Sequence, residues 1–299
     1  MQIQPAAPAA APQAVAAAPA TTDDVTVAHV GRVGARPSEP MVSRDLEQRS
    51  LDNIQRVIGR TRDFFSQYGI GEDRGNGPVK VAQDFSFPNA AYIKMEPATV
   101  GARQAREGVE MLLFGVAPET GLPFGLDDDV VVHEYAHRVI NNIVDLHQPG
   151  QPGTVGEHLA DVVAAVLDDT DPWTIGERVV PGGMRSMSEP DNPRFDHVDR
   201  HGRARPMPGH MADFVRTSKD NGGVHINVGI PNRAAALIGK ELGRERLGDI
   251  YMNAILNHLP DEASFGDAAR ATISSAAQLY GRDSDETAAV RDAWLAVAS

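Results

Sequence analysis

The pentapeptide His133-Glu134-Tyr135-Ala136-His137 has the residue types and the spacing of a zinc site that carries its own general base. On a helix, two histidines four residues apart lie on the same face, where one metal ion can bind both imidazoles at ~2.0–2.1 Å. Glu134 is turned by roughly 100° from the first ligand, so its carboxylate can reach a water molecule on the metal without binding the metal. The stretch therefore predicts a hydrolase that uses a zinc-activated water.

Two solvent-facing histidines on a helix are the alternative interpretation of this pentapeptide. Three valines at residues 130–132 lead into it, and Val139-Ile140 follows it. A helix with so many apolar residues is expected to be largely buried, and buried His and Glu side chains are costly unless they are paired or bind a metal. The flanking residues therefore favour the metal site.

A tetrahedral catalytic zinc needs a third protein ligand and one position for water. Glu157, twenty residues after His137, stands at the start of an apolar-periodic stretch that predicts a second helix, and it can complete a set of two histidines and one glutamate. Asp161 lies one turn further on the same face, where it can accept the free ring N–H of a ligating histidine. An ordinary first-turn charge at Glu157 and a solvated one at Asp161 are the alternatives.

A third histidine, His225, follows the turn sequence Asn221-Gly222-Gly223 and precedes an apolar segment. Asp220, five residues earlier, can orient its imidazole as a hydrogen-bond donor toward a developing oxyanion. A lone histidine after a turn is more often structural, so the assignment depends on the whole phrase.

In this order and at this spacing, the three phrases resemble the thermolysin family of zinc endopeptidases, over roughly residues 78–299. The resemblance implies one role for each residue already described. The zinc ligands fall on His133, His137 and Glu157, the catalytic carboxylate on Glu134, the aspartate behind the ligands on Asp161, and the oxyanion histidine with its aspartate on His225 and Asp220.

Two weaker phrases extend the resemblance to substrate binding. Residues 184–188 are similar to the family's Leu-Arg-Ser-Met-Ser, whose arginine contacts a substrate carbonyl, so Arg185 is the implied counterpart. Residues 89–92 are similar to the family's Asn-Ala-Phe-Trp edge strand, which implies that Asn89 and Ala90 pair with the substrate backbone.

The specificity pocket that the resemblance implies is apolar. We expect it to be formed by Val130, Val139 and Met184, with Phe124 nearby, and to favour cleavage on the amino side of Leu, Ile or Phe. One methylene changes such discrimination by only ~1–3 kcal/mol, so a broad range of substrates is expected.

One departure from the family concerns the oxyanion site. The family's assisting tyrosine would fall near Gln148, and no tyrosine lies between Tyr135 and Tyr251. Loss of one oxyanion donor costs ~2.7–4 kcal/mol in comparable sites, so we expect a slower enzyme. His147 is the candidate replacement donor.

A second departure concerns calcium. The family's carboxylate cluster is retained at Asp129, Asp168 and Glu177, whereas Pro172 and Thr174 stand where oxygen ligands are usual. Carbonyl oxygens and water can complete the six to eight ligands that calcium takes, so one calcium is expected and two are not.

The elements that position these residues follow from the periodicity of apolar side chains. Residues 45–69 have helical spacing and end at glycines, and four further helices are predicted from Arg233 onward, at residues 234–242, 247–258, 265–280 and 287–297. Short strands are predicted at Val79-Lys80-Val81, Phe85-Ser86-Phe87 and residues 111–115, and a turn at residues 121–125.

We therefore expect an α+β, thermolysin-like fold of two lobes with the zinc helix between them. Residues 46–138 would form a reduced N-terminal α/β lobe that ends in the zinc helix, and residues 139–299 a mainly helical C-terminal lobe. Residues 1–45 are rich in alanine and proline, which predicts a disordered arm. A mere linker or an artefact of the assigned start site is the alternative. They contain no standard secretory signal, so the choice between secretion as in the family, non-classical export and a cytoplasmic location stays open.

Composition excludes several other classes of protein. The net charge of −13 argues against binding to nucleic acid or anionic membranes, and no apolar run approaches the ~20 residues of a membrane span. The absence of cysteine excludes disulfides and thiolate ligands. We expect a monomer that acts on protein or peptide substrates.

Two alternatives to a zinc endopeptidase stay open. The missing tyrosine and the reduced front lobe are consistent with a weakened relative that binds zinc or a partner without cutting. An aminopeptidase would use the same ligands but needs carboxylates for the free amine of its substrate, whereas Asn89-Ala90 favours an extended internal peptide. Cleavage of a blocked peptide separates an endopeptidase from an aminopeptidase.

Overall fold

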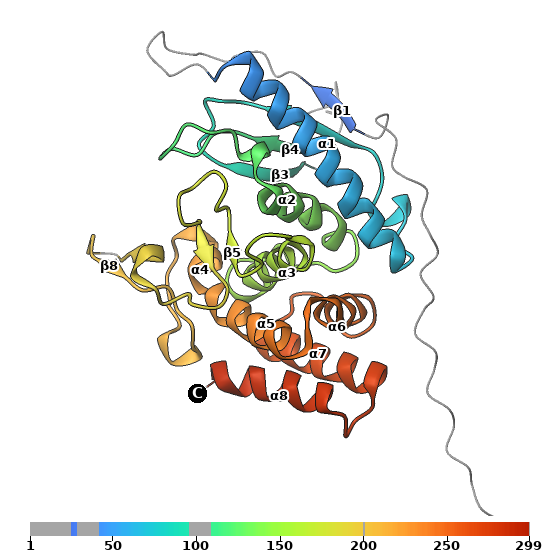
Figure 1. Cartoon of the computed structure of the whole chain (residues 1–299). Helices are drawn as coiled ribbons and strands as arrows, with labels where there is room; N and C mark the ends of the chain where they lie inside the picture. The colour runs from blue at the N-terminus through green and yellow to red at the C-terminus, as the bar shows by residue number, and fades with distance from the viewer. Residues whose placement is uncertain (1–24, 29–41, 96–108, 200, 299) are drawn as a thin grey trace, which may run out of the picture.

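The computed structural model describes residues 25–28, 42–95, 109–199 and 201–298. Figure 1 shows a small sheet and α1 (Arg44–Gln67) at one end of the molecule and a group of helices at the other. The helices α2 (Asp128–Ile140) and α3 (Gln151–Leu167) lie between the two ends. The expected α+β architecture with a largely helical C-terminal part is confirmed.

The sheet joins four of the described strands in the order β1-β2-β4-β3. The strands are β1 (Val25–Ala28), β2 (Val79–Gln83), β3 (Ala90–Met95) and β4 (Val109–Phe114). β2 pairs in parallel with β1 and β4, while β3 runs antiparallel to β4. β3 is therefore an edge of the sheet, which confirms the edge strand expected next to Asn89. The outer side of an edge strand presents N–H and C=O groups that can pair with another chain.

The strand predicted at Phe85-Ser86-Phe87 is wrong, because these residues form a turn. The carboxylate of Asp84 accepts hydrogen bonds from the backbone N (3.0 Å) and the hydroxyl (2.6 Å) of Ser86. This local side-chain to backbone bonding competes with strand pairing, which an alternating apolar pattern alone does not reveal. The turn expected at residues 121–125 lies earlier, at residues 118–120, and closes at Gly121 (φ +69°). The helix η4 (Phe124–Leu126) follows it.

Two parts of the range 1–45 are described. Val25–Ala28 forms β1, so the predicted disorder is wrong there, and its two valines and one threonine favour strand pairing with β2. Helix α1 begins at Arg44, where the hydroxyl of the preceding Ser43 accepts a hydrogen bond from Leu46 N. Residues 1–24 and 29–41 of the predicted arm lie outside the described residues.

The four C-terminal helices are confirmed as α5 (Gly229–Leu242), α6 (Arg244–Asn257), α7 (Phe265–Tyr280) and α8 (Asp285–Ala298). Helix α5 begins five residues earlier than expected and includes Pro231. Because Pro231 is the third residue of the helix, its missing N–H would have had no partner within the helix. Helix α3 likewise begins earlier than expected, at Gln151, so Glu157 lies in its second turn.

The remaining described elements are short. They are η2 (Glu72–Arg74), β5 (Thr174–Ile175), β6 (Arg185–Ser186), η5 (Pro193–Phe195), β7 (His197–Val198), β8 (Ala204–Arg205), η6 (Met211–Asp213) and α4 (Asp220–Asn227). Among the residues that the structure describes, no helix combines the length and the apolar character needed to cross a bilayer.

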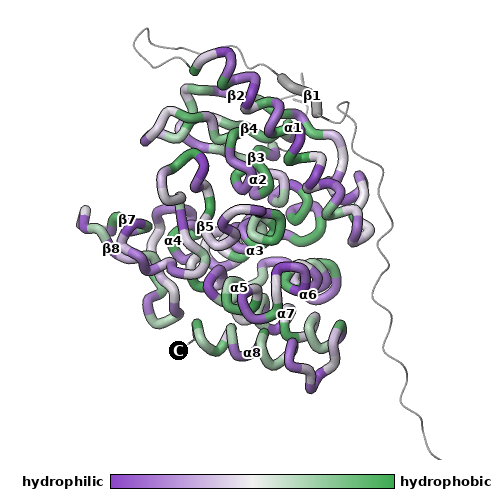
Figure 2. Tube along the Cα trace, in the orientation of Figure 1, coloured by the Kyte–Doolittle hydropathy of each residue, from purple (hydrophilic) through white to green (hydrophobic). Residues whose placement is uncertain are grey.

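A single apolar core runs through both ends of the molecule, and α2 and α3 carry it. Figure 2 shows hydrophobic residues dominating α3 at the centre of the structure. The boundary expected at residues 138/139 falls inside α2, which packs against α1 on one side and α3 on the other. The division into lobes stays a prediction. The site is thus built on two adjacent buried helices, which hold side chains more rigidly than loops do.

Candidate metal centre

Helix α2 begins at a capped end that lies in the core. The carboxylate of Asp127 accepts hydrogen bonds from the backbone N–H of Asp129 (3.1 Å) and Val130 (3.3 Å). Val131 and Val132 are buried, as are His133 and Glu134, which confirms the expected buried helix. His133 is therefore buried, and the side chain of His137 is only 14% exposed, so neither is a solvent-facing residue.

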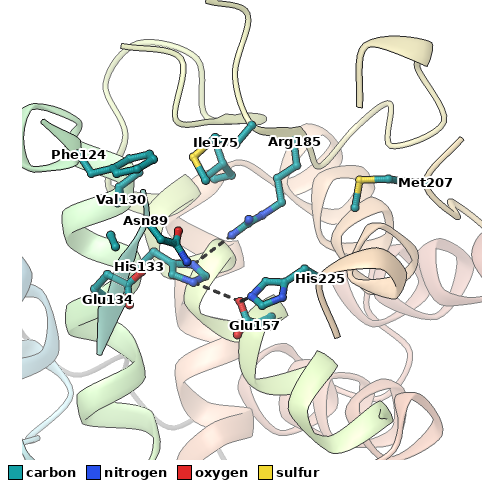
Figure 3. Close-up of a pocket in the computed structure, with 12 residues that line it drawn as sticks. Asn89, Phe124, Val130, His133, Glu134, Glu157, Ile175, Arg185, Met207 and His225 are labelled. Carbon is teal, nitrogen blue, oxygen red and sulfur yellow. Dashed lines mark hydrogen bonds and ion pairs between the residues drawn. The ribbon is translucent and has the colours of Figure 1, made fainter. Parts of the chain in front are cut away.

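Three predicted ligands converge on one point. The Nε2 atoms of His133 and His137 are 3.0 Å apart, and they lie 3.3 and 3.4 Å from the two carboxylate oxygens of Glu157. Four ligands at ~2.0–2.1 Å around a tetrahedral zinc are about 3.3–3.4 Å from one another. Glu157 Oε2 is buried without a hydrogen bond, although ring nitrogens of His133 and His225 lie 3.3 Å away. This donor set has the geometry and the chemistry of a zinc site. Figure 3 shows two of its members, His133 and Glu157, facing each other.

The charges of the site support the same conclusion. Burial alone lowers the pKa of His133, but its contacts with Asp161 and Glu157 raise that pKa to about 9. Burial raises the pKa of Glu157, yet the imidazoles of His137 and His133 hold it well below its usual value. In the absence of metal, protons therefore balance the buried carboxylates, and a divalent cation can take the place of these protons.

Asp161 lies directly behind His133, as expected. Its Oδ1 is 2.8 Å from His133 Nδ1, so the imidazole presents Nε2 to the metal position. Arg185 donates to both oxygens of Asp161, from Nε at 2.7 Å and from Nη2 at 2.6 Å. Asp161 is fully buried, and although burial raises its pKa, the charge of Arg185 and the contact with His133 hold it well below the usual range.

Glu134 is held by the edge strand. Its Oε2 accepts a 2.7 Å hydrogen bond from the backbone N–H of Tyr92, in β3. The sequence does not reveal this contact, because a backbone donor depends on how the strand lies beside α2 and not on the residue type. Ala90, the first residue of this strand, and the preceding Asn89 line the same cavity as Glu134. Figure 3 labels Asn89 and Glu134 in this cavity.

His225 is oriented by the turn that precedes it. Asp220 accepts hydrogen bonds from His225 Nδ1 (2.6 Å) and from the backbone N–H of the same residue (2.8 Å). The turn places Asn221, Gly222 and Gly223 at positive φ, and a Cβ on Gly222 would meet the backbone of Gly150 at 2.8 Å. Burial lowers the pKa of His225, but Asp220 and Glu157 together raise it to about 10.

Two adjoining cavities, of about 300 and 450 Å³, share Asn89, Ala90, His133, Glu134, Glu157 and His225. The apolar wall of the smaller one includes Phe124, Val130 and Met184, as expected. The prediction that Val139 belongs to this wall is wrong, because Val139 is fully buried in the core. It lies nine residues after Val130, about two and a half turns, and therefore on the opposite face of α2.

Two further apolar residues complete this wall, and neither was predicted from the sequence. Ile175, in β5, and Met207, after β8, line the smaller cavity together with Arg185 (Figure 3). Ile175 lies in a strand of two residues and Met207 outside any helix or strand, so periodicity carries no signal at either, and only their position in the folded chain identifies them.

The larger cavity contains the region where the family's tyrosine was expected. His147 and Gln148 both line it, and Asp145 accepts a bond from Gln148 Nε2 (3.2 Å) and lies 3.1 Å from His147 Nδ1. His147 is half-exposed and has Nε2 available beyond this contact. Gln148 Oε1 is buried without a hydrogen-bond partner.

A second cluster of metal-ligand residues brings together Asp129, Asp168 and Glu177. Burial raises the pKa of Asp129 to about 10, and nearby carboxylates add to the shift. Glu177 Oε2 is buried without a hydrogen bond. Buried carboxylates that are this close repel one another unless a proton or a cation lies among them.

Comparisons with known proteins agree with this geometry. The family model for the thermolysin metallopeptidase alpha-helical domain matches residues 144–298. The extracellular elastase of Staphylococcus epidermidis is 38% identical over 159 residues, which is 52% of this chain and 29% of that protein. The bacillolysin of Bacillus amyloliquefaciens is 35% identical over 256 residues, 84% of this chain and 44% of that protein. The chain thus spans less than half the length of either relative.

A solved structure extends the similarity to the fold. The precursor of protealysin, a metalloproteinase from Serratia proteamaculans, matches with a TM-score of 0.69 and 28% sequence identity. The match covers 92% of this chain and 86% of that one. The likeness therefore includes the sheet and α1 as well as the helical part that the family model matches.

Proposed function

The chain belongs to the thermolysin family of metallopeptidases, and from this premise we propose that it is a zinc-dependent metalloendopeptidase. The observation that carries the proposal is the convergence of His133, His137 and Glu157 in a cleft that also contains Glu134 and the edge of a sheet. A zinc ion bound there would polarise the scissile carbonyl and lower the pKa of water toward ~7.

Each neighbouring side chain then has a defined task. Glu134 takes the proton of the attacking water and passes it to the leaving amine, a role worth ~10²–10⁴-fold in rate. His225, held at Nδ1 by Asp220, donates from Nε2 to the oxyanion of the tetrahedral intermediate. The 2.7 Å hydrogen bond from Tyr92 N keeps Glu134 oriented toward the cleft before substrate arrives.

Substrate binding is proposed along β3. An extended internal peptide can pair with the edge at Asn89 and Ala90, which line both cavities. Arg185 gives Nε and Nη2 to Asp161, and its guanidinium still has N–H donors for a substrate carbonyl. The apolar wall that contains Phe124 and Met207 supports cleavage on the amino side of bulky hydrophobic residues.

The function is tested with a peptide blocked at both ends, incubated with the purified chain before and after treatment with a zinc chelator. We expect cleavage of internal bonds before large apolar residues, its loss on chelation and its return when zinc is added. Cleavage only of peptides with a free amine would indicate an aminopeptidase. A chain that binds zinc and leaves every peptide uncut would instead be the non-catalytic relative.

We also propose one calcium ion at Asp129, Asp168 and Glu177, because these three carboxylates lie close enough to repel one another and the buried Oε2 of Glu177 has no hydrogen-bond partner. At a calcium concentration 100 times the dissociation constant, binding stabilises the folded state by ~2.7 kcal/mol, or about 5–10 °C in Tm. We expect calcium to raise the Tm of the chain by about this amount, as measured by calorimetry.

The Asp168→Asn variant should lose this calcium response. Asp169→Asn is its matched control, because Asp169 is the exposed neighbour and pairs with Arg60 instead. An equal calcium response in all three proteins would refute the assignment.

A further inference from the structure

A buried chain of hydrogen bonds continues from Asp161 into the helical part of the molecule. Asn232, in α5, donates from Nδ2 to Asp161 Oδ2 at 2.8 Å. On its other side, Asn232 Oδ1 lies 2.8 Å from Nδ1 of His158, and His158 Nε2 lies 3.2 Å from the hydroxyl of Tyr251, in α6. The chain thus links three helices behind the face that carries the zinc ligands.

All four side chains of this chain of hydrogen bonds are buried. Asp161, His158 and Asn232 have no exposed surface, and Tyr251 is 2% exposed. The ring of His158 also packs edge-on against Tyr251, with centroids 5.3 Å apart. Polar groups in such a place cost stability unless each is hydrogen-bonded, so every donor and acceptor of this chain needs a matching partner.

The donors and acceptors allow one consistent assignment. Because the carboxylate of Asp161 only accepts, the amide of Asn232 must turn its NH₂ toward it and its oxygen toward His158. His158 then carries its hydrogen on Nδ1, and its bare Nε2 accepts from the hydroxyl of Tyr251. Every group donates in the direction of Asp161, so that rotation of any one of them would leave a buried group unpaired.

We propose that Asn232 and His158, supported by Tyr251, are positioning residues that fix the carboxylate of Asp161 against His133 and so raise the affinity of the site for its metal. The inference rests on the proposed zinc site and deepens it. Asp161 also accepts hydrogen bonds from Arg185, which lines the substrate cavity. With Arg185 as its only other partner, the carboxylate could turn toward that cavity. Asn232 holds Oδ2 from the opposite helix, which leaves Oδ1 facing the imidazole of His133.

The test measures zinc dissociation constants of the full chain by competition with a chromophoric chelator at fixed pH. Asn232→Leu has nearly the same size and removes both of the amide's bonds. We expect zinc affinity to fall by about 10–100-fold, the usual effect of losing such supporting contacts. Tyr251→Phe removes only the last hydroxyl, so a smaller loss is expected.

Ser275→Ala is the matched control. Ser275 is fully buried in the same helical region, where its hydroxyl donates to the carbonyl of Ile250 at 2.7 Å, and it takes no part in the chain behind Asp161. It should lower the Tm and leave the zinc dissociation constant unchanged. Circular dichroism and Tm of the metal-free proteins show which variants are folded.

A second pair keeps the inference testable if Asn232→Leu does not fold. His158→Asn retains a side-chain N–H near the position of Nδ1, whereas His158→Leu has none. If the donor matters, the Asn variant should bind zinc more tightly than the Leu variant, although both lack the ring. Equal affinity in this pair, or a folded Asn232→Leu within twofold of the parent, would overturn the inference. A parent that binds no zinc would refute the proposed function itself.

Discussion

Replacing Glu134 by glutamine is expected to lower kcat by about 10²–10⁴-fold while the chain still binds zinc. Glutamine has the same length, and its carbonyl oxygen can still accept the hydrogen bond from Tyr92 N, so the side chain should stay in place. It cannot accept a proton from water at neutral pH, however. The loss should therefore appear in kcat, measured on a blocked peptide, with little change in KM.

The control for this variant is Glu110→Gln. Glu110 lies on the neighbouring strand β4, where it pairs with Arg138 and accepts from the hydroxyl of Tyr92, and it does not line either cavity. Zinc content of each protein is measured by atomic absorption. Full turnover by pure Glu134→Gln would rule out the proposed general base, whereas loss of zinc from this variant would show that Glu134 has a structural role instead.

The metal centre could be predicted from the sequence because its components are local. Two histidines four residues apart must share a helical face, and the motifs around Glu157 and His225 carry recognisable phrases. The structure brings the candidate ligands His133, His137 and Glu157 together. The same helical periodicity explains why the prediction for Val139 was wrong. Nine residues after Val130, Val139 lies on the opposite face of α2.

What the sequence could not predict depends on contacts between distant segments. The amide of Tyr92 reaches Glu134 only because β3 is the edge strand beside α2. Asn232 and His158 lie 74 positions apart, and each has an ordinary identity for its helix. Met207 lines the cavity from a loop that has no periodic pattern. Such residues complete a site whose candidate metal ligands come from short sequence motifs, and only the folded chain identifies them.

Replacing His225 by alanine is expected to lower kcat/KM by about 10²–10³-fold, again without loss of zinc. His225 is the side chain whose Nε2 faces the cleft with its other nitrogen fixed, at 2.6 Å from Asp220. With glutamine in place of the family's tyrosine, this donor should carry most of the stabilisation of the oxyanion. Asp220→Asn should produce a smaller loss, because the imidazole stays in place but is held less firmly.

The same experiment decides whether His147 takes part. If its free Nε2 donates to the oxyanion, His147→Ala should reduce kcat/KM by itself and reduce it further in the His225→Ala background. His258→Ala is the control, since His258 is the partly exposed C-cap residue of α6, contacts Gln278 and lines neither cavity. If His147→Ala behaves like this control in both backgrounds, oxyanion stabilisation on this side of the cleft belongs to His225. A His225→Ala variant with undiminished kcat/KM would exclude that role and place the donor elsewhere in the cleft.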